Sequence, residues 1–131
     1  MKLQDILYKV SVRSVVGNRD VNVSEVQTDS RKVKSGSVFI AVKGTTADGH
    51  QFIEKAIGSG AAVIVCEKIP SSVKDGITYV EVENSAAAAG TIAHNFFGSP
   101  SEKMKVVGVT GTNGKTTIAT LLYKLFTSLG Y

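Results

Sequence analysis

The sequence at residues 110–117 is Thr110-Gly-Thr-Asn-Gly-Lys-Thr-Thr117, and it lies between an apolar run and an amphipathic segment. Residues 105–110 have the composition of a buried strand, and residues 115–129 repeat apolar side chains at helical spacing. A strand, a glycine-rich loop, a lysine with a neighbouring hydroxyl, and a helix are the context that a phosphate-binding loop requires. The stretch therefore predicts the first unit of a parallel-sheet nucleotide-binding domain.

Glycine and lysine each have a physical role in such a loop. Glycine permits backbone angles that other residues rarely adopt and lets the main chain approach a phosphate closely, while the amides at a helix start attract anions. We expect Lys115, the candidate catalytic residue, to reach the β- and γ-phosphates of ATP, and the Thr116 hydroxyl to be a ligand of Mg²⁺. The predicted ATP-binding residues are Gly111, Thr112, Asn113, Gly114, Lys115, Thr116 and Thr117.

The loop departs from the general pattern G-x-x-x-x-G-K-[ST] at its first position. The chain has Val109 where that pattern has glycine, and Gly111 lies inside the motif. The alternative interpretation is a glycine-rich turn with a solvated lysine. Strand, loop, lysine, threonines and helix all agree, and this agreement favours a phosphate loop.

The helix that follows the loop has one continuous apolar face, made of Ile118, Leu121, Leu122, Leu125, Phe126 and Leu129. Such a face needs a sheet to cover it. The parallel strands of that sheet are not supplied before Tyr131, so we expect the second domain to be truncated. The uncovered face is then expected to fray or to drive self-association.

The upstream residues alternate between strand and helix patterns, which predicts an α/β fold. We expect a helix at residues 3–9, strands at 21–27, 38–42, 61–66 and 78–82, a helix after Gly49, and a helix from Asn84 to Phe97. The predicted buried positions of the last two helices are Phe52, Ile53, Ala56 and Ile57, and then Ala86, Ala89, Ala93, Phe96 and Phe97. The predicted organisation is a small domain at residues 1–98, a linker at 99–104, and the start of a second domain at 105–131.

Composition limits the classes of function. The chain has 131 residues, of which 43% are hydrophobic and 20% charged, and its net charge is +4. The basic residues are scattered, which argues against nucleic-acid binding, and a modest positive charge also suits an anionic small substrate. No apolar run has membrane-spanning length, so we expect neither membrane insertion nor a signal peptide, and a cytoplasmic location. The lone Cys66 lies in an apolar run and is expected to be buried packing.

The motif Thr110 to Thr117 resembles the ATP-binding loop of the Mur ligases of peptidoglycan synthesis, which carry Val or Ile where glycine is otherwise expected. Upstream, residues 28–42 (TDSRKVKSGSVFIAV) and 44–53 (GTTADGHQFI) resemble the amino-terminal domain of the member that adds the third peptide residue. The resemblance covers nearly the whole chain, and it rests on two separate motifs at the expected separation.

This resemblance implies that the first domain binds the uridine diphosphate part of UDP-N-acetylmuramoyl-L-alanyl-D-glutamate. Thr28 and Ser30 would line the pocket, and Thr45, Thr46 and Ala47 match a second substrate-binding loop, in which many relatives have His-Gln at positions 45 and 46. Loop hydroxyls and amides at strand ends are suitable donors for uracil and phosphate oxygens.

The resemblance also implies a reaction. In the family, ATP phosphorylates the substrate carboxylate, an incoming amine attacks the acyl phosphate, and an amide bond results. The remaining Mg²⁺ ligands and the amino-acid pocket would lie beyond Tyr131, so we expect this chain to bind substrate without catalysis. A related family alternative is the ligase that adds D-alanyl-D-alanine, and the added residue could be meso-diaminopimelate or L-lysine.

Several alternatives remain open at this point. Ser30 could bond to local backbone within a turn, and Arg31 could pair with a diphosphate, with Asp29 or with Glu25. His50 and His94 show no catalytic or metal-binding constellation and are expected to be structural. A self-sufficient phosphate-loop hydrolase is not among the open alternatives, because it would need an acidic Mg²⁺-binding strand after the loop and only fifteen residues follow Thr116. A non-enzymatic nucleotide-binding module is a further alternative, and a nucleic-acid-binding or scaffold protein is the weakest.

Overall fold

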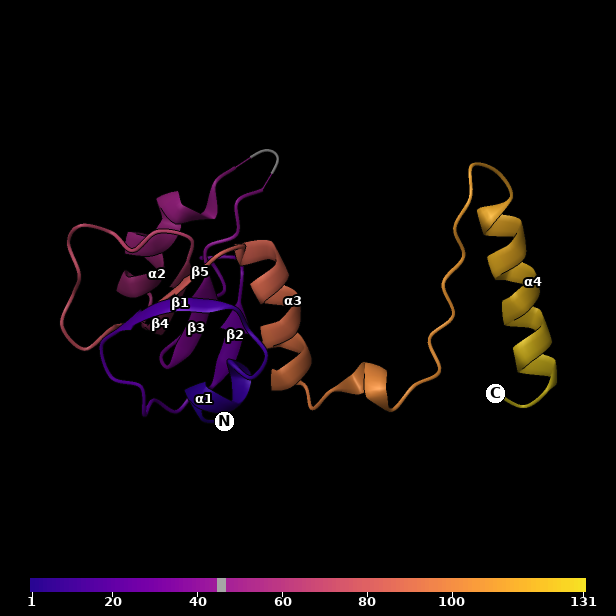
Figure 1. Ribbon diagram of the computed structural model, residues 1–131, viewed down its shortest axis with the longest axis horizontal. Helices are drawn as coiled ribbons and strands as arrows, with labels where there is room; N and C mark the ends of the chain where they lie inside the picture. Colours follow the sequence, from indigo (N-terminus) through magenta and orange to yellow (C-terminus); the bar gives the residue numbers. More distant parts are fainter. Residues whose placement is uncertain (45–46) are drawn as a thin grey trace. The chain divides into compact units, whose positions relative to one another are not determined.

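The computed structural model describes residues 1–44 and 47–131, and the chain divides into two compact units, Met1–Pro100 and Ser101–Tyr131 (Figure 1). The division falls inside the predicted linker at residues 99–104, where a short 3₁₀ helix, η2 (Pro100–Glu102), forms. The predicted limits of the two domains stay a prediction.

The first unit is built on a sheet of five strands in the order β1-β5-β4-β3-β2. Their bounds are β1 Val12–Val16, β2 Glu25–Gln27, β3 Ser37–Ile40, β4 Ala61–Cys66 and β5 Thr78–Val82. Strands β2 to β5 pair in parallel, and β1 pairs with β5 antiparallel. The carboxyl ends of the four parallel strands therefore meet at one edge of the sheet, where ligands of α/β proteins commonly bind.

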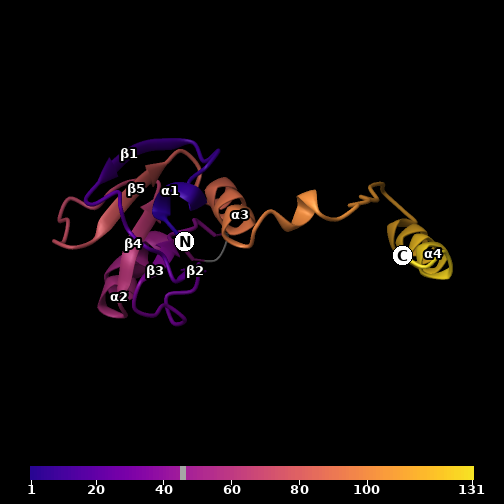
Figure 2. The same ribbon diagram turned by 90° about the horizontal axis from the view of Figure 1, so that it is seen from below.

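Helices cover both faces of this sheet (Figure 2). Their bounds are α1 Leu3–Ile6, η1 Gly49–Phe52, α2 Ile53–Gly58 and α3 Ser85–Phe96. Alternate side chains of each strand point to opposite faces. In β4, Val63 and Val65 pack on the side of α1 and α3, whereas Ile64 and Cys66 pack on the side of α2. The unit thus has three layers and two hydrophobic clusters.

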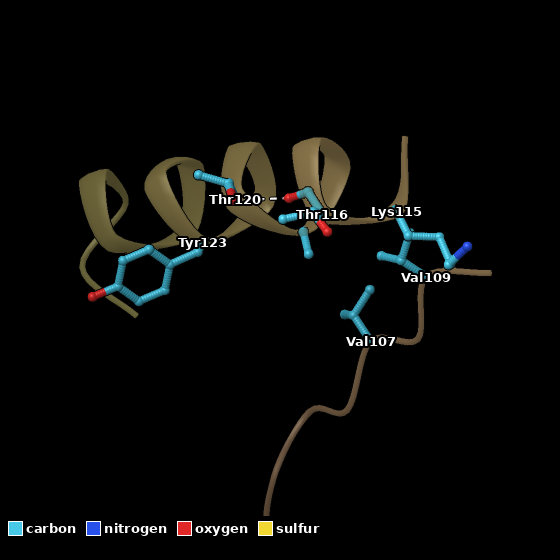
Figure 3. Close-up of a pocket in the computed structure, with 7 residues that line it drawn as sticks. Val107, Val109, Lys115, Thr116, Thr120 and Tyr123 are labelled. Atoms are coloured by element: carbon cyan, nitrogen blue, oxygen red, sulfur yellow. Dashed lines mark hydrogen bonds between the residues drawn. The ribbon is translucent and has the colours of Figure 1, made fainter. Parts of the chain in front are cut away.

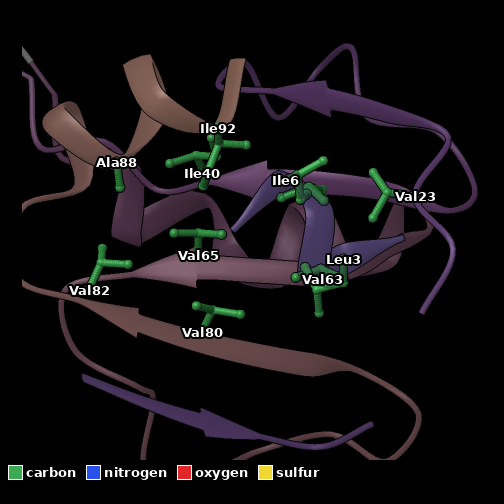
Figure 4. Close-up of a cluster of buried hydrophobic side chains, with 11 residues drawn as sticks. Leu3, Ile6, Val23, Ile40, Val63, Val65, Val80, Val82, Ala88 and Ile92 are labelled. Atoms are coloured by element: carbon green, nitrogen blue, oxygen red, sulfur yellow. The ribbon is translucent and has the colours of Figure 1, made fainter. Parts of the chain in front are cut away.

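The larger cluster lies between the sheet and the helices α1 and α3 (Figure 4). Its buried members are Leu3, Ile6, Val23, Val38, Ile40, Val63, Val65, Val80, Val82, Ala88 and Ile92. The second cluster, on the α2 face, consists of Val33, Phe39, Ala41, Ile53, Ala56, Ala61, Ile64, Cys66 and Tyr79. Cys66 is fully buried as predicted, and this burial raises the pKa of its thiol to about 11.

Strands β4 and β5 coincide with the predicted ranges 61–66 and 78–82, and the other predicted strands and helices of the first unit are shorter in the structure. Strand β1 was missed by the sequence interpretation. Its pairing with β5 shifts register between Val12 and Ser14, and its side chains are exposed or only half-buried. The alternation that normally marks a strand is therefore weak there.

The predicted apolar face of α3 is only partly the buried one, because Ala89 and Phe96 pack against the core while Ala86 and Phe97 are exposed. The structure buries Ser85, Ala88 and Ile92, while Phe97 is 70% exposed. The helix start explains the difference. The Asn84 side chain accepts a hydrogen bond from the Ala87 N–H at 2.8 Å, and Ser85 turns inward to a carboxylate, which together fix the helix phase.

The second unit contains helix α4, Lys115–Ser128. Residues 105–110 form no strand, contrary to the prediction, and no described residue pairs with them in a ladder. A strand is defined by such pairing, so an apolar run without a partner remains extended chain. The apolar face of α4 is correspondingly uncovered, with Leu121 61% and Leu125 51% exposed. Within the described part of the chain, no helix is long and apolar enough to cross a membrane.

Candidate functional site

The predicted phosphate loop places its lysine over its own main chain. Gly111 and Gly114 have φ angles of 148° and 76°, values that favour glycine. The Lys115 ammonium donates hydrogen bonds to the carbonyl oxygens of Gly111 at 2.5 Å and of Thr112 at 3.4 Å. The ammonium group is thus held at the mouth of the loop, where it could exchange a carbonyl partner for a phosphate oxygen.

The start of α4 fits nucleotide phosphates. Gly114, in the left-handed region, directly precedes the helix, which is 14 residues long. The first bond of the helix runs from the Ile118 N–H to the Gly114 carbonyl at 2.9 Å, and earlier amides of a helix have no acceptor within it. A Cβ atom at Gly114 would meet no atom within 4 Å, so open space lies beside the loop. Free amides, open space and an ammonium group are the donor set that a polyphosphate requires.

Thr116, the predicted metal ligand, lies on the first turn of α4. Its side chain and those of Thr120 and Tyr123 face Val107 and Val109 of the extended segment across a hollow of about 580 Å³ (Figure 3). Lys115 lines the same hollow. Among the described residues, no group of three or more His, Cys, Asp or Glu side chains could hold a metal ion.

A second group of polar residues lies in the first unit, at the carboxyl edge of the sheet. Thr28 directly follows β2, and Ser30 is only 6% exposed. The structure shows Arg31 paired with Asp29, with its Nε and Nη2 atoms 2.9 and 2.8 Å from the two carboxylate oxygens. This contact holds the pKa of Asp29 well below its ordinary value. Of the partners considered for Arg31 in the sequence analysis, the structure shows Asp29.

The second predicted substrate loop follows β3 at the same edge. Lys43 and Asp48 pair as an antiparallel bridge, and the Gly44 N–H donates to the Ala47 carbonyl at 3.0 Å. These four residues form the stem of the loop, and Ala47 is exposed. Thr45 and Thr46, the predicted contacts at its tip, lie outside the described residues.

Asp48 of the stem belongs to a hydrogen-bonded cluster with His50, Glu67 and Ser85, and the sequence analysis did not predict this cluster. The His50 ring lies 2.6 Å from the Asp48 carboxylate through Nδ1, and its Nε2 accepts the Glu67 N–H at 2.9 Å. The Glu67 carboxylate in turn accepts from the N–H and the hydroxyl of Ser85 at 2.9 and 2.8 Å. Glu67 directly follows the buried strand β4, and this position at the carboxyl edge could have identified it as a candidate site residue.

Hydrogen bonding stabilises both carboxylates of this group in their charged form. The backbone N–H of His50, and then its ring, hold the pKa of Asp48 below its ordinary value. The backbone N–H and hydroxyl of Ser85 do the same for the pKa of Glu67. Lys43 and Lys68 line an adjacent hollow of about 410 Å³ together with these groups, so the edge presents ammonium groups beside paired carboxylates.

A three-layer α/β unit with polar loops at its carboxyl edge, followed by a predicted phosphate loop, is typical of nucleotide-binding α/β proteins. Comparison with known families makes this specific. The profile described as "Mur ligase family, catalytic domain" matches residues 22–97, and the chain belongs to the Mur ligase family.

Curated relatives agree over the whole chain. A protein of Cytophaga hutchinsonii named UDP-N-acetylmuramoyl-L-alanyl-D-glutamate--2,6-diaminopimelate ligase is 55% identical over 133 residues, covering 100% of this chain and 27% of the relative. A protein of the same name from Bacteroides fragilis is 48% identical with the same coverage. The chain therefore spans about a quarter of the length of these relatives.

Solved structures show the same fold. The D-alanyl-D-alanyl ligase of Acinetobacter baumannii that acts on UDP-N-acetylmuramoylalanyl-D-glutamyl-2,6-diaminopimelate has a TM-score of 0.64 at 24% identity, over 88% of this chain and 25% of that one. The MurF ligase of Thermotoga maritima, solved in complex with ADP, has a TM-score of 0.58 at 34% identity, over 81% and 24% of the two chains. The mixed α/β fold predicted from the sequence is thus confirmed.

Proposed function

We propose that the first unit binds UDP-N-acetylmuramoyl-L-alanyl-D-glutamate for an ATP-dependent ligase that adds the third amino acid of the peptidoglycan peptide. The observation that carries this proposal is the 55% identity to a ligase of that name across the entire chain, both predicted loops included. The names of the relatives favour 2,6-diaminopimelate as the added residue.

The geometry of the carboxyl edge supports the proposal. Thr28 and the described stem of the second loop, of which Asp48 is half-buried and Lys43, Gly44 and Ala47 are exposed, follow neighbouring strands, β2 and β3. Hydroxyl groups, backbone amides and the ammonium group of Lys43 are thereby brought to one edge of the sheet. A uridine diphosphate group needs donors of this kind for its uracil carbonyls and its phosphates.

We propose that the second unit holds the phosphates of ATP. The amides of residues 111–117 would bind the phosphate oxygens, Lys115 would neutralise charge on the transferred phosphoryl group, and the Thr116 hydroxyl would hold Mg²⁺. When bound, Mg²⁺ would screen the negative charge of the phosphates. We propose the amide-forming activity for a protein of the relatives' length and binding alone for these 131 residues. Because the reaction consumes ATP, we place the protein in the bacterial cytoplasm.

Calorimetric titration of the chain with four ligands tests this function. The ligands are UDP-N-acetylmuramoyl-L-alanyl-D-glutamate, the same molecule extended by diaminopimelate, UDP and Mg-ATP. We expect saturable binding of the first, weakened when Thr28 or Ser30 is replaced by alanine, and little heat with Mg-ATP. Tighter binding of the extended molecule would favour the D-alanyl-D-alanine-adding alternative, and no binding of any UDP ligand would contradict the proposal.

A further inference from the structure

Five residues at the carboxyl edge form a closed ring of contacts. The Lys43 N–H donates to the Ser85 hydroxyl at 3.3 Å, and that hydroxyl donates to Glu67 at 2.8 Å. The Glu67 N–H donates to the His50 ring at 2.9 Å, and the other ring nitrogen lies 2.6 Å from Asp48. Asp48 pairs with Lys43 across the stem of the loop, which closes the ring.

The donors and acceptors of this ring are consistent in direction. His50 Nε2 accepts from a backbone N–H, so the proton of the neutral ring lies on Nδ1 and is donated to Asp48. The Ser85 hydroxyl gives its one proton to Glu67 and accepts from Lys43. Every donor in the ring therefore meets an acceptor, as expected of a hydrogen-bond network that fixes a conformation.

The ring connects three places that are distant in the sequence. Lys43 and Asp48 are the two ends of the loop stem, Glu67 follows β4, and Ser85 is the first residue of α3. Gly49 lets the chain after the stem approach Val42, two residues beyond β3, because a Cβ atom there would lie 2.6 Å from the Val42 carbonyl oxygen. The loop is thus held at both ends by the edge of the sheet, while neither hydrophobic cluster includes any member of the ring.

We propose that His50, Glu67 and Ser85 are positioning residues, which hold the described stem residues Lys43, Gly44, Ala47 and Asp48 in the conformation that binds the nucleotide sugar. This inference rests on the proposed function. Fixing the stem before the ligand arrives removes part of the entropy cost of binding, so opening the ring should weaken binding. His50 is then more than a structural histidine.

Binding of UDP-N-acetylmuramoyl-L-alanyl-D-glutamate by five variants of the 131-residue chain tests this inference. His50→Ala, Glu67→Ala and Ser85→Ala open the ring, and we expect Kd to rise about tenfold in each, as for the loss of one or two hydrogen bonds. Glu67→Gln keeps the oxygen that accepts from Ser85, and we expect its Kd to stay within about threefold of wild type. Ser14→Ala is the matched control. It also removes a hydroxyl that donates to a glutamate, Glu81, at 3.0 Å, but this contact joins β1 and β5 and includes no member of the ring.

Hydrogen exchange at the amides of Gly44, Gly49 and Glu67 separates loop ordering from global unfolding. We expect faster exchange at these amides in the ring-opening variants, with unchanged exchange in β4. If wild type binds the ligand and Glu67→Ala binds it equally well, the positioning role is wrong while the proposed function stands. Equal loss in Glu67→Gln and Glu67→Ala would also overturn it. If wild type itself shows no binding, the proposed function fails, and this inference with it.

Discussion

Gly49 is the first residue of η1 and Gly58 is the last residue of α2, and the two glycines should respond oppositely to an added methyl group. At Gly49 a Cβ atom would lie 2.6 Å from the carbonyl oxygen and 2.7 Å from the nitrogen of Val42, whereas at Gly58 it would meet nothing within 4 Å. We expect Gly49→Ala to lower the free energy of unfolding by about 1–3 kcal/mol. Gly58→Ala, at the end of α2, should raise it by up to about 1 kcal/mol. Urea denaturation measures both, and equal effects would contradict the close approach at Gly49.

Glu67 provides a pH test. Its pKa is lowered from an ordinary value of 4.5 by the hydrogen bonds from Ser85, so the unfolded chain binds more protons than the folded chain near that pH. The stability that these bonds contribute is present above pH 4.5 and is lost as the pH falls through the lower folded-state pKa. We expect the melting temperature to fall between pH 6 and pH 3, and to fall less in Glu67→Gln. Asp29 and Asp48 have lowered pKa values as well, so the comparison of the two proteins carries the test. Parallel curves would show that the Ser85 contact does not stabilise the charged form.

Substitutions at Ile92 and Phe97 test which face of helix α3 packs against the sheet. Ile92 is fully buried and Phe97 is 70% exposed, although the sequence pattern placed Phe97 in the core. We expect Ile92→Ala to cost about 2–5 kcal/mol of unfolding free energy and Phe97→Ala less than about 1 kcal/mol. Thermal and urea unfolding of the two variants measure the difference. A larger loss at Phe97 would restore the sequence-based register.

Helix α3 also shows where sequence reasoning ends. Its existence, its Asn84 cap and the buried strands β4 and β5 follow from local chemistry and from apolar runs. Its phase depends on the contact between Ser85 and Glu67, which are 18 positions apart in the sequence. The ring at the carboxyl edge is also made of contacts between residues that are distant in the sequence. The spacing of apolar residues along the chain gives no information about such contacts. The parts of the predicted phosphate loop are consecutive in the sequence, so the motif could be recognised locally, but the strand predicted at residues 105–110 does not form and phosphate binding stays a prediction.

The second unit should govern how the chain behaves in solution. The apolar face of α4, with Leu121, Leu125 and Leu129 each more than half exposed, has no cover within the described unit. We therefore expect concentration-dependent self-association, and we expect Leu125→Lys to shift the sedimentation profile toward monomer. Lys124→Leu, on the same helix, should strengthen association. A monomeric wild type at all concentrations would contradict a role for this face.

The central claim, that the carboxyl edge of the first unit binds the nucleotide sugar, is tested most directly by amide chemical-shift mapping. UDP-N-acetylmuramoyl-L-alanyl-D-glutamate would be titrated into the labelled chain. We predict that the shifted amides cluster at Thr28, Ser30, Lys43, Gly44 and Ala47, with little change in β1 or α4. Shifts confined to α4 and the loop before it, or spread along β1, would contradict the account.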